Sequence, residues 1–448
     1  MMNIGEMPLG ELLQQSFKCH CGRVHETNLE SVIIASGALT ETAGIIKDNG
    51  WNNVFVIADT NTWEAAGKDL VDHLKSSGLN TTQQVFDDAH LVPDEHAIGR
   101  VLMRLHPEVD IIVGVGAGTI NDMARFVSFR LKLPYIIVAT APSMDGYASS
   151  VAPLITNNLK TTYECHTPAA VIADLDIIAK APQAMIAAGF GDILGKYTCL
   201  LDWKLSAIIN DEYYCETVVS MMRAALEKTV SLKHGLASRD KEAVGKLMEA
   251  LILAGVAMSY VGNSRPASGS EHHLAHFWEM HMLFEGRPPA LHGAKVGIAT
   301  GLVLEMYECL QEANIGQEFL LSAKPGVQPD WEEEIRRVFR QGSGEVLALE
   351  QQAGKNDLNA HKLRMEKVIA RWDQIQEVLQ QAPSAGQVRK LLEEVGGPTQ
   401  PEQVELSPET VLDSIKYAKE IRARYTVLQL LWDLGLLQTY AKRIVGLE

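Results

Sequence analysis

Residues 1–183 alternate short apolar runs with longer amphipathic stretches. Five runs contain many β-branched residues and little charge, and they begin at Ser31 (SVIIASG), Asn53 (NVFVIAD), Asp110 (DIIVGVG), Leu133 (LPYIIVAT) and Ala170 (AVIADLDII). Such runs are typical of strands that are buried on both faces. Stretches with helical spacing, such as TWEAAGKDLVDHLKSSG, lie between them. This alternation predicts a parallel sheet covered by helices.

The pattern changes near residues 181–184. Beyond this point apolar positions recur every three or four residues, as in KEAVGKLMEALILAGVAMSY and VLDSIKYAKEIRARYTVLQLLWDLGLL, which predicts helices. A stretch rich in Gln and Glu, 341–402, is expected to form solvated helices and connections. The sequence therefore predicts two domains, an α/β domain with a parallel, Rossmann-like sheet over 1–183 and an all-helical domain over 184–448.

Length and charge narrow the class of protein. A chain of 448 residues is too long for one ordinary hydrophobic core. Its net charge of 40 − 56 = −16 and its lack of a run of basic residues argue against nucleic-acid binding. The start of the chain has no signal-peptide pattern, and LMEALILAGVAMSYVG contains Glu249 and is expected to be too short to span a bilayer. Six cysteines are too few for a disulfide framework, so we expect a cytoplasmic, enzyme-sized protein without membrane insertion.

Glycines follow the third apolar run, in the order Gly114, Gly116 and Gly118. A helix that begins just after such a turn presents free N–H groups and a positive dipole end, which suit a pyrophosphate. The pattern differs from the usual dinucleotide fingerprint, and a tight turn explains the glycines equally well. Asp59, at the end of NVFVIAD, suits the adenosine ribose of a cofactor or simply a turn.

A second polar segment, TAPSMDGYASS, follows the run LPYIIVAT. Its hydroxyl groups and the carboxylate of Asp145 come where ligands bind in open α/β sheets, beyond the carboxyl ends of the strands. The segment suits a nicotinamide ribose and a substrate hydroxyl. A turn rich in Ser, Asp and Gly is the alternative.

Four of the 14 histidines lie within SGSEHHLAHFWEMH, at positions His272, His273, His276 and His281. On a helix, His272 and His276 share one face. His292 in LHGAKVG and Asp192 in GFGDILGKY add a further imidazole and a carboxylate. Each residue alone suits an exposed or capping role, but a catalytic divalent metal takes about three such ligands and keeps one position open.

A third cluster, CHCGRVH, contains Cys19, His20, Cys21 and His25. Soft ligands this close can hold a structural zinc ion. However, Cys-x-Cys is tighter than the usual zinc spacing and no second pair follows it. The alternative is a surface loop before the first strand.

Five of these segments occur in a familiar order: GVGAGTINDM, TAPSMDGYASS, GFGDILGKY, NSRPASGSEHHLAH and LHGAKVG, from Gly114 to Gly297. In this order they resemble the superfamily of iron-containing alcohol dehydrogenases and dehydroquinate synthases. RPASGSEH narrows the resemblance to the bacterial type of sn-glycerol-1-phosphate dehydrogenase. This resemblance implies reversible reduction of dihydroxyacetone phosphate by NADH or NADPH, with one divalent metal, zinc or nickel, polarising the C2 carbonyl.

The resemblance also implies roles for individual residues. The cofactor residues would be Asp59, Gly116, Ala117, Gly118, Thr119, Ile120, Thr140, Ala141, Pro142, Ser143 and Ser149. Substrate would contact Asp145, Asp192 and His276, and the metal would bind Asp192, His272 and His292. His273 and His281 would be structural. The chain departs from the family in having Ala117 inside the glycine triplet and Ala294 after His292-Gly293, where a glutamate is frequent.

Several alternatives stay open. A glycerol or alcohol dehydrogenase, a dehydroquinate-synthase-like cyclase and a non-catalytic descendant share this scaffold. RPASGSEH argues against the cyclase, and the intact Asp192, His272 and His292 argue against the non-catalytic reading. Candidate phosphate ligands are Arg265, Lys196 and Lys204, although Arg265 also suits a salt bridge that fixes its loop. Asp59 hints at NAD(H), and the resemblance suggests a homodimer.

Overall fold

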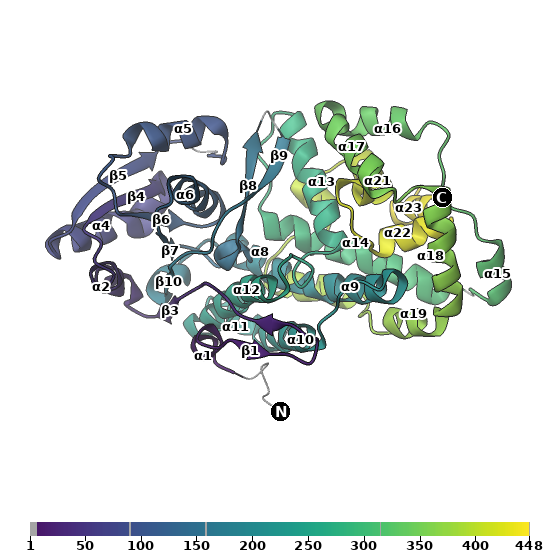
Figure 1. Cartoon of the computed structure of the whole chain (residues 1–448), viewed down its shortest axis with the longest axis horizontal. Coiled ribbons are helices and arrows are strands. Elements are labelled where there is room, and N and C mark those ends of the chain that lie inside the picture. Colours follow the sequence, from purple (N-terminus) through teal and green to yellow (C-terminus); the bar gives the residue numbers. More distant parts are fainter. Residues whose placement is uncertain (1–6, 89–90, 157–158, 314, 448) are drawn as a thin grey trace. The chain divides into compact units, whose positions relative to one another are not determined.

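The computed structural model of the protein describes residues 7–88, 91–156, 159–313 and 315–447 (Figure 1). The chain divides into two compact units. Unit 1 comprises Met1–Ile193, Ser220–Asn263 and Glu394–Gly396, and unit 2 comprises Leu194–Val219, Ser264–Glu393 and Gly397–Glu448.

Unit 1 contains a six-stranded sheet in which every neighbouring pair is parallel. In spatial order the strands are β3 (Ser31–Ala35), β10 (Ala170–Asp174), β7 (Tyr135–Ala139), β6 (Ile111–Gly116), β4 (Asn53–Asp59) and β5 (Asn80–Phe86). The five apolar runs all form strands, so the predicted parallel sheet is confirmed. The sequence did not reveal β5, because this edge strand alternates polar and buried side chains.

Helices and two small hairpins complete unit 1. The hairpins are β1 (Phe17–Lys18) with β2 (Val24–His25), and β8 (Val151–Thr156) with β9 (Leu159–Glu164). The helices are α1 (Leu9–Leu13), α2 (Glu41–Asp48), α3 (Thr60–Thr62), α4 (Lys68–Ser76), α5 (Glu95–Arg104), α6 (Gly118–Leu131), α7 (Leu175–Ile178), α8 (Gln183–Leu194), α10 (Glu216–Ser231), α11 (Lys233–Ala237) and α12 (Lys241–Val261). Apolar side chains of β4, β6, β7 and β10 form its core with those of α2 and α4.

Unit 2 is helical. Its helices are α9 (Lys196–Asn210), α13 (Ser270–Phe284), α14 (His292–Glu312), α15 (Gln317–Ser322), α16 (Trp331–Phe339), α17 (Ser343–Ala353), α18 (Leu358–Ala370), α19 (Trp372–Leu379), α20 (Ala385–Glu394), α21 (Pro408–Tyr417), α22 (Val427–Asp433) and α23 (Leu437–Ile444). Helices α13 and α14 pack against each other and contribute to one large apolar core. The expected all-helical character of this part of the chain is confirmed.

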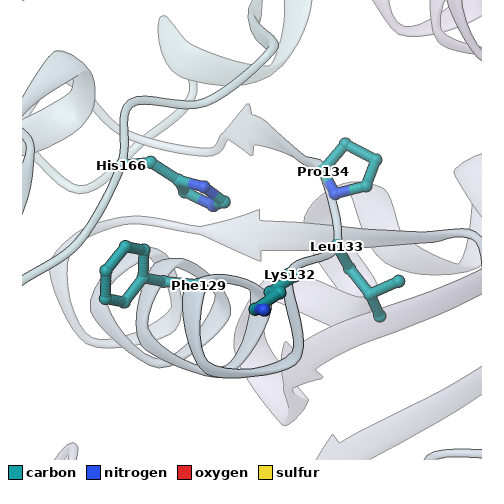
Figure 2. A pocket seen from close by; sticks show the side chains of 5 residues that line it. All are labelled: Phe129, Lys132, Leu133, Pro134 and His166. Carbon is teal, nitrogen blue, oxygen red and sulfur yellow. The ribbon is translucent and has the colours of Figure 1, made fainter.

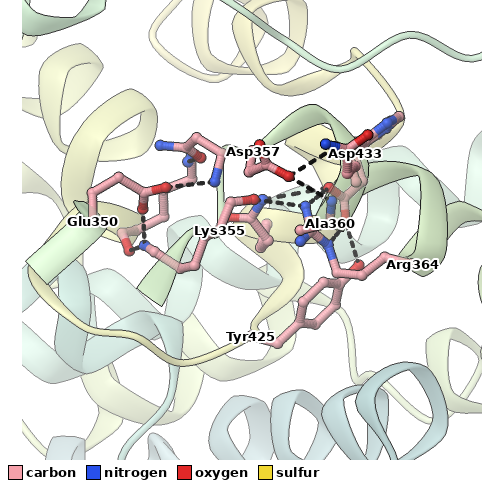
Figure 3. A network of polar contacts seen from close by, with 12 residues as sticks. Glu350, Lys355, Asp357, Ala360, Arg364, Tyr425 and Asp433 are labelled. Carbon is pink, nitrogen blue, oxygen red and sulfur yellow. Dashed lines mark hydrogen bonds and ion pairs between the residues drawn. The ribbon is translucent and has the colours of Figure 1, made fainter. Parts of the chain in front are cut away.

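The stretch 341–402 was expected to be solvated, and that expectation was wrong in part. Met365, Val368 and Ile375 of α18 and α19 are buried in the core of unit 2. Buried ionic side chains of the same stretch join a network with α22 and the segment before it, which includes Glu350, Lys355, Arg364, Tyr425 and Asp433 (Figure 3). The many Gln and Glu residues obscure narrow apolar faces on these helices.

The boundary predicted from the change in sequence pattern, between 183 and 184, follows the switch from strands to helices. The compact units instead follow packing, and unit 1 takes in 220–263 as well.

Two helical segments, Gln183–Asn210 and Lys241–Val261, are long and apolar enough to cross a membrane. The expectation that the second was too short was therefore wrong. Because 83 % and 72 % of their most apolar windows are buried, core packing explains their composition.

Candidate functional site

The predicted cofactor residues of β6 and α6 occupy the carboxyl end of a central strand of unit 1. A β-carbon on Gly116 would come within 2.7 Å of Ile120, so close packing of the helix on the strand requires this glycine. Packing does not require Gly118, because a β-carbon there would meet only Met144, at 3.8 Å. The backbone at Gly118 and Thr119 therefore begins α6 with room for a ligand beside it.

Asp59 ends β4, the strand beside β6, and its carboxylate caps the helical turn that follows. Its Oδ1 accepts a hydrogen bond from Thr62 N at 2.9 Å, while Asp59 N donates to Thr62 Oγ1 at 3.0 Å. Asp59 therefore caps the turn after β4, in line with the turn-forming alternative that the sequence left open, and its second carboxylate oxygen is not used in this cap. Its contact with a ribose stays a prediction.

The segment after β7 packs tightly within unit 1. The side chains of Thr140, Ala141, Ser143 and Ser149 are buried, as is that of Asp145. Pro142 lies against α8, since a β-carbon on Gly189 would come within 1.8 Å of the carbonyl oxygen of Pro142. Asp145 N donates a hydrogen bond to Asp192 Oδ2 at 2.9 Å. Asp145 and Asp192, both of which the family resemblance assigns to substrate binding, are therefore in direct contact.

Within unit 2, helices α13 and α14 bring three imidazole rings together. The ring centroids of His272 and His292 are 5.2 Å apart, and His276 lies 5.8 Å from each of them. His272 is 4 % exposed, whereas His276 and His292 are partly exposed. His292 is the first residue of α14, so its ring projects where that helix begins.

Glu271 orients the ring of His272. Glu271 Oε1 lies 2.8 Å from His272 Nδ1, and the carboxylate also accepts hydrogen bonds from Thr198 Oγ1 at 2.6 Å and Gly269 N at 2.6 Å. Burial alone would raise the pKa of Glu271, but its hydrogen bonds with His272 and Thr198 outweigh burial and hold that pKa below its ordinary value. A carboxylate on Nδ1 places the proton there and makes Nε2 the metal-binding nitrogen.

Asp202 of α9 fixes the start of α13. Its Oδ2 accepts hydrogen bonds from Ser270 N at 2.7 Å and Ser270 Oγ at 2.6 Å, and its Oδ1 accepts one from Tyr307 at 2.8 Å. Burial and the nearby charge of Glu271 raise the pKa of Asp202 to about 6. A β-carbon on Gly269 would meet Asp202 Oδ2 at 2.7 Å, which explains the glycine before Ser270.

Sequence reasoning missed Glu271 and Asp202. Glu271 stands beside His272 in the sequence, so a carboxylate next to a predicted ligand was the available signal. Asp202 lay in YTCLLDW, which offered no such signal.

Asp192 is buried on α8, in unit 1. It is predicted to bind a metal with His272 and His292 of unit 2, and one carboxylate with two imidazoles is a donor set that suits a divalent metal. Three protein ligands also leave an open position, as catalytic metal sites require.

The other two histidines of α13 have surroundings that suit structural roles. His273 is buried, and burial together with nearby guanidinium groups lowers its pKa well below the ordinary value. The ring of His281 stacks on Phe277, with centroids 4.4 Å apart.

The three candidate phosphate ligands are engaged elsewhere. Arg265 forms an ion pair with Glu212, with Nη2 and Oε2 2.5 Å apart. This is the salt bridge that sequence analysis named as its alternative. Lys196 is buried and donates to the carbonyl oxygen of Ala267 at 3.1 Å, and the ammonium group of Lys204 lies over an aromatic ring.

A shallow hollow of about 340 Å³ in unit 1 is separate from these residues (Figure 2). Phe129, Lys132, Leu133, Pro134 and His166 line it. It lies where α6 ends and β7 begins, so it is at the opposite edge of the sheet from the predicted cofactor residues.

Comparison with known proteins gives matches over most of the chain. The family model described as "Iron-containing alcohol dehydrogenase" matches residues 33–182. The chain is 34 % identical over 434 residues to "Glycerol-1-phosphate dehydrogenase [NAD(P)+]" of Geobacillus thermodenitrificans, covering 96 % of this chain and 99 % of that relative. It is 33 % identical to the protein of the same name from Halalkalibacterium halodurans, covering 94 % and 98 %.

A solved structure shares the fold at much lower identity. A probable glycerol dehydrogenase from Sinorhizobium meliloti matches with a TM-score of 0.60 at 16 % identity, covering 92 % of this chain and 98 % of that one. At this identity the likeness concerns the fold alone.

Proposed function

The chain belongs to the glycerol-1-phosphate dehydrogenase family, and from this premise we propose how its residues catalyse their reaction. The reaction is the reversible reduction of dihydroxyacetone phosphate to sn-glycerol 1-phosphate with NADH or NADPH. The observation that carries it is the similarity to enzymes of that name over nearly the whole of both chains.

The cofactor lies, in this proposal, along the carboxyl ends of β4, β6 and β7. The backbone of Gly116 to Ile120 holds the pyrophosphate, with Ala117 and Thr119 inside that turn, because α6 begins there and Gly118 leaves space. The segment from Thr140 to Ser143 and the hydroxyl of Ser149 hold the nicotinamide end. Asp59 contacts the adenosine ribose and favours NAD(H), since a carboxylate repels a 2′-phosphate.

Asp192, His272 and His292 hold one divalent metal, zinc or nickel. What supports this is the hydrogen bond between Glu271 and His272, because metal-binding histidines usually donate their second N–H to a carboxylate or carbonyl. One carboxylate and two imidazoles suit both metals. The loss of the usual glutamate after His292-Gly293 is compatible with this set, since Glu271 supplies a carboxylate beside the other histidine.

When bound, the metal supplies Lewis acidity at the C2 carbonyl oxygen of the substrate, and the nicotinamide supplies the hydride. Asp145 positions the substrate hydroxyl, held in place by its backbone hydrogen bond to Asp192. The partly exposed ring of His276 delivers a proton to the C2 oxygen as the alcohol forms. Glu271 keeps the His272 ring from turning, so the geometry is set before substrate arrives.

We also propose a homodimer, as the family resemblance suggested, and a cytoplasmic location, as the composition of the chain suggested. Light scattering of the purified protein tests the dimer: a mass of twice 49.2 kDa supports it, and the monomer mass contradicts it.

The decisive test follows NADH oxidation with dihydroxyacetone phosphate. The enzyme is chelated, and zinc or nickel is then restored separately. Oxidation that disappears on chelation and returns with metal supports the proposal. A comparable rate with unphosphorylated dihydroxyacetone would instead favour a glycerol dehydrogenase. Absence of oxidation with either cofactor in every metal form would contradict the proposed reaction.

A further inference from the structure

The side chain of Arg125 is fully buried in unit 1, and it lies outside the residues assigned so far to cofactor, substrate or metal. It extends from α6, the helix whose first residues are proposed to hold the pyrophosphate. A buried charge is costly unless hydrogen bonds and an opposite charge compensate it. We propose that Arg125 is a positioning residue that, together with Asn121, fixes the backbone beside Asp145, an inference that rests on the proposed role of Asp145 in substrate binding.

The guanidinium group of Arg125 donates to three backbone carbonyl groups that follow Asp145 in the sequence. Its Nη2 lies 2.5 Å from the carbonyl oxygen of Gly146 and 3.2 Å from that of Tyr147, and its Nη1 lies 2.8 Å from that of Val151. The planar fork of an arginine suits such a set of acceptors, whereas the donors of a lysine diverge from a single nitrogen. One side chain of α6 therefore holds the whole stretch 146–151.

Two further contacts hold the guanidinium group of Arg125 against β7 and its own helix. Its Nε donates to the hydroxyl group of Tyr135 at 2.8 Å, and its Nη1 forms an ion pair with Asp122, at 3.0 Å from Oδ1. Asp122 lies one turn earlier in α6, so it supplies an opposite charge without leaving the helix. Packing within unit 1 therefore sets the direction of the Nη groups before any ligand binds.

The backbone around Asp145 is held from both sides. Its N–H donates to Asp192 Oδ2 at 2.9 Å. The carbonyl oxygen of the next residue, Gly146, accepts hydrogen bonds from Arg125 and also from Asn121 Nδ2, the latter at 3.2 Å. Asn121 is buried and belongs to α6, as Arg125 does. The helix that begins at the proposed pyrophosphate turn therefore also orients the backbone beside the proposed substrate carboxylate.

The segment that Arg125 holds also carries proposed cofactor residues. The hydroxyl group of Tyr147 donates to the carbonyl oxygen of Ala141 at 2.5 Å, and burial raises the pKa of Tyr147, so this phenol stays a donor. Ser149, assigned to the nicotinamide end, lies within the stretch 146–151. Loss of the Arg125 contacts should therefore disturb the substrate and nicotinamide contacts of this segment, while the pyrophosphate turn at Gly116–Ile120 stays in place.

The test compares the metal-loaded, full-length enzyme with Arg125→Lys, which keeps the charge but not the fork. We expect kcat/KM for dihydroxyacetone phosphate to fall by about 10- to 100-fold, the scale of a small misplacement of reacting groups. The dissociation constant of NADH, from fluorescence titration, should change by less than about threefold. Tyr135→Phe removes a hydrogen bond of the same guanidinium group away from the segment, and it should keep kcat/KM within about twofold. An equal loss in NADH binding would indicate a general disturbance of unit 1 and overturn the positioning role.

A double-mutant cycle with Asp145→Asn separates positioning from stability. Because the positioned carboxylate is already absent, Arg125→Lys should lower kcat/KM by less than about threefold in the Asp145→Asn background. The full loss in that background would overturn the proposal. If Arg125→Lys does not fold, Asn121→Ala replaces it in the same cycle, with the same dependence on Asp145 expected. Absence of NADH oxidation by the native protein would refute the proposed function and this role with it, whereas native activity with unchanged kcat/KM in Arg125→Lys would refute the role alone.

Discussion

The two groups of metal-ligating residues differ in number, softness and exposure. The predicted ligands Asp192, His272 and His292 offer one carboxylate and two imidazoles, and His292 is partly exposed. The residues around Cys21 in unit 1 offer the thiols of Cys19 and Cys21 and the imidazole of His25, and only His25 among these three is buried. A catalytic metal site takes about three protein ligands and keeps one position open, whereas a closed structural site takes four, commonly thiolates and imidazoles. The ligands around His272 therefore suit a reactive site, and the sulfur-rich residues around Cys21 suit a structural role.

The groups that orient the two histidines, His272 and His25, also differ. His272 is held by the carboxylate of Glu271, and His25 by the carbonyl oxygen of Tyr260. A carboxylate makes the imidazole more electron-rich, which strengthens a site with few ligands, whereas a carbonyl mainly fixes the tautomer.

His272→Ala should have the largest effect. It removes a ligand of the three-residue set, so we expect loss of the catalytic metal and a fall in kcat/KM of at least about a thousandfold, since Lewis-acid stabilisation is worth several kcal/mol. NADH oxidation and metal content are measured on the same samples. His106→Ala, at an exposed histidine, is the control. Full metal content and full rate in His272→Ala would show that the ligand assignment is wrong.

His276→Ala should keep the metal but lower kcat by about 10²- to 10⁴-fold, the usual value of a positioned acid or base. His276 is assigned proton transfer and not metal binding. Metal analysis together with the dependence of kcat on pH distinguishes these roles. Metal loss equal to that of His272→Ala would make His276 a ligand.

In the network of Figure 3, buried charges of unit 2 lie against groups of opposite charge. Burial alone would raise the pKa of Glu420, but the charges of Lys419 and Lys355 outweigh it and lower that pKa to about 2. Because this pKa lies below the ordinary value of 4.5, the stability gained is present above pH 4.5 and is lost as the pH falls toward 2.

Glu420→Gln leaves these two lysines without their buried partner and should lower the free energy of unfolding at pH 7 by about 3 kcal/mol. Because an amide does not titrate, Glu420→Gln should not show the loss of stability that protonation of Glu420 causes as the pH falls. Denaturant unfolding between pH 7 and 3 measures both effects, with Glu318→Gln at an exposed position as the control. Parallel pH curves for Glu420→Gln and the native protein would refute the assignment.

Glu271→Gln should have the smallest effect. The amide keeps the shape of the side chain but removes its charge, so we expect metal affinity to fall by about 10- to 100-fold, with activity restored by excess metal. Metal-buffer titration measures the change, and Glu285→Gln at the exposed end of α13 is the matched control. Unchanged affinity would leave Glu271 with a purely structural role.

The sequence predicted the strands that are buried on both faces of the sheet, because their apolar runs are uninterrupted. NVFVIAD predicted β4 to the residue, because every position between its ends is buried. By contrast, β5 and the β8–β9 hairpin have polar positions that resemble loops, so they were missed. The helices of 341–402 look solvated because each buries only a narrow face.

The sequence predicted site residues that lie close together within one recognisable segment, such as His272 and His276. It did not predict contacts between residues that are far apart in the sequence and meet only in the folded protein. Thr198 donates a hydrogen bond to Glu271 from a distant part of the sequence, so neither segment alone suggested this contact. Asp202 likewise meets Ser270 only through the packing of α9 near α13.

The most direct test of the central claim combines activity and metal content in one series. NADH oxidation with dihydroxyacetone phosphate is followed for the native protein, for His272→Ala and for Cys215→Ser, and the metal bound per chain is counted in each sample. We predict that His272→Ala loses activity and one metal, while Cys215→Ser, at a buried cysteine outside the predicted active site, keeps its metal and its activity per folded molecule. Retained activity in His272→Ala, with no change in its metal content, would contradict the account.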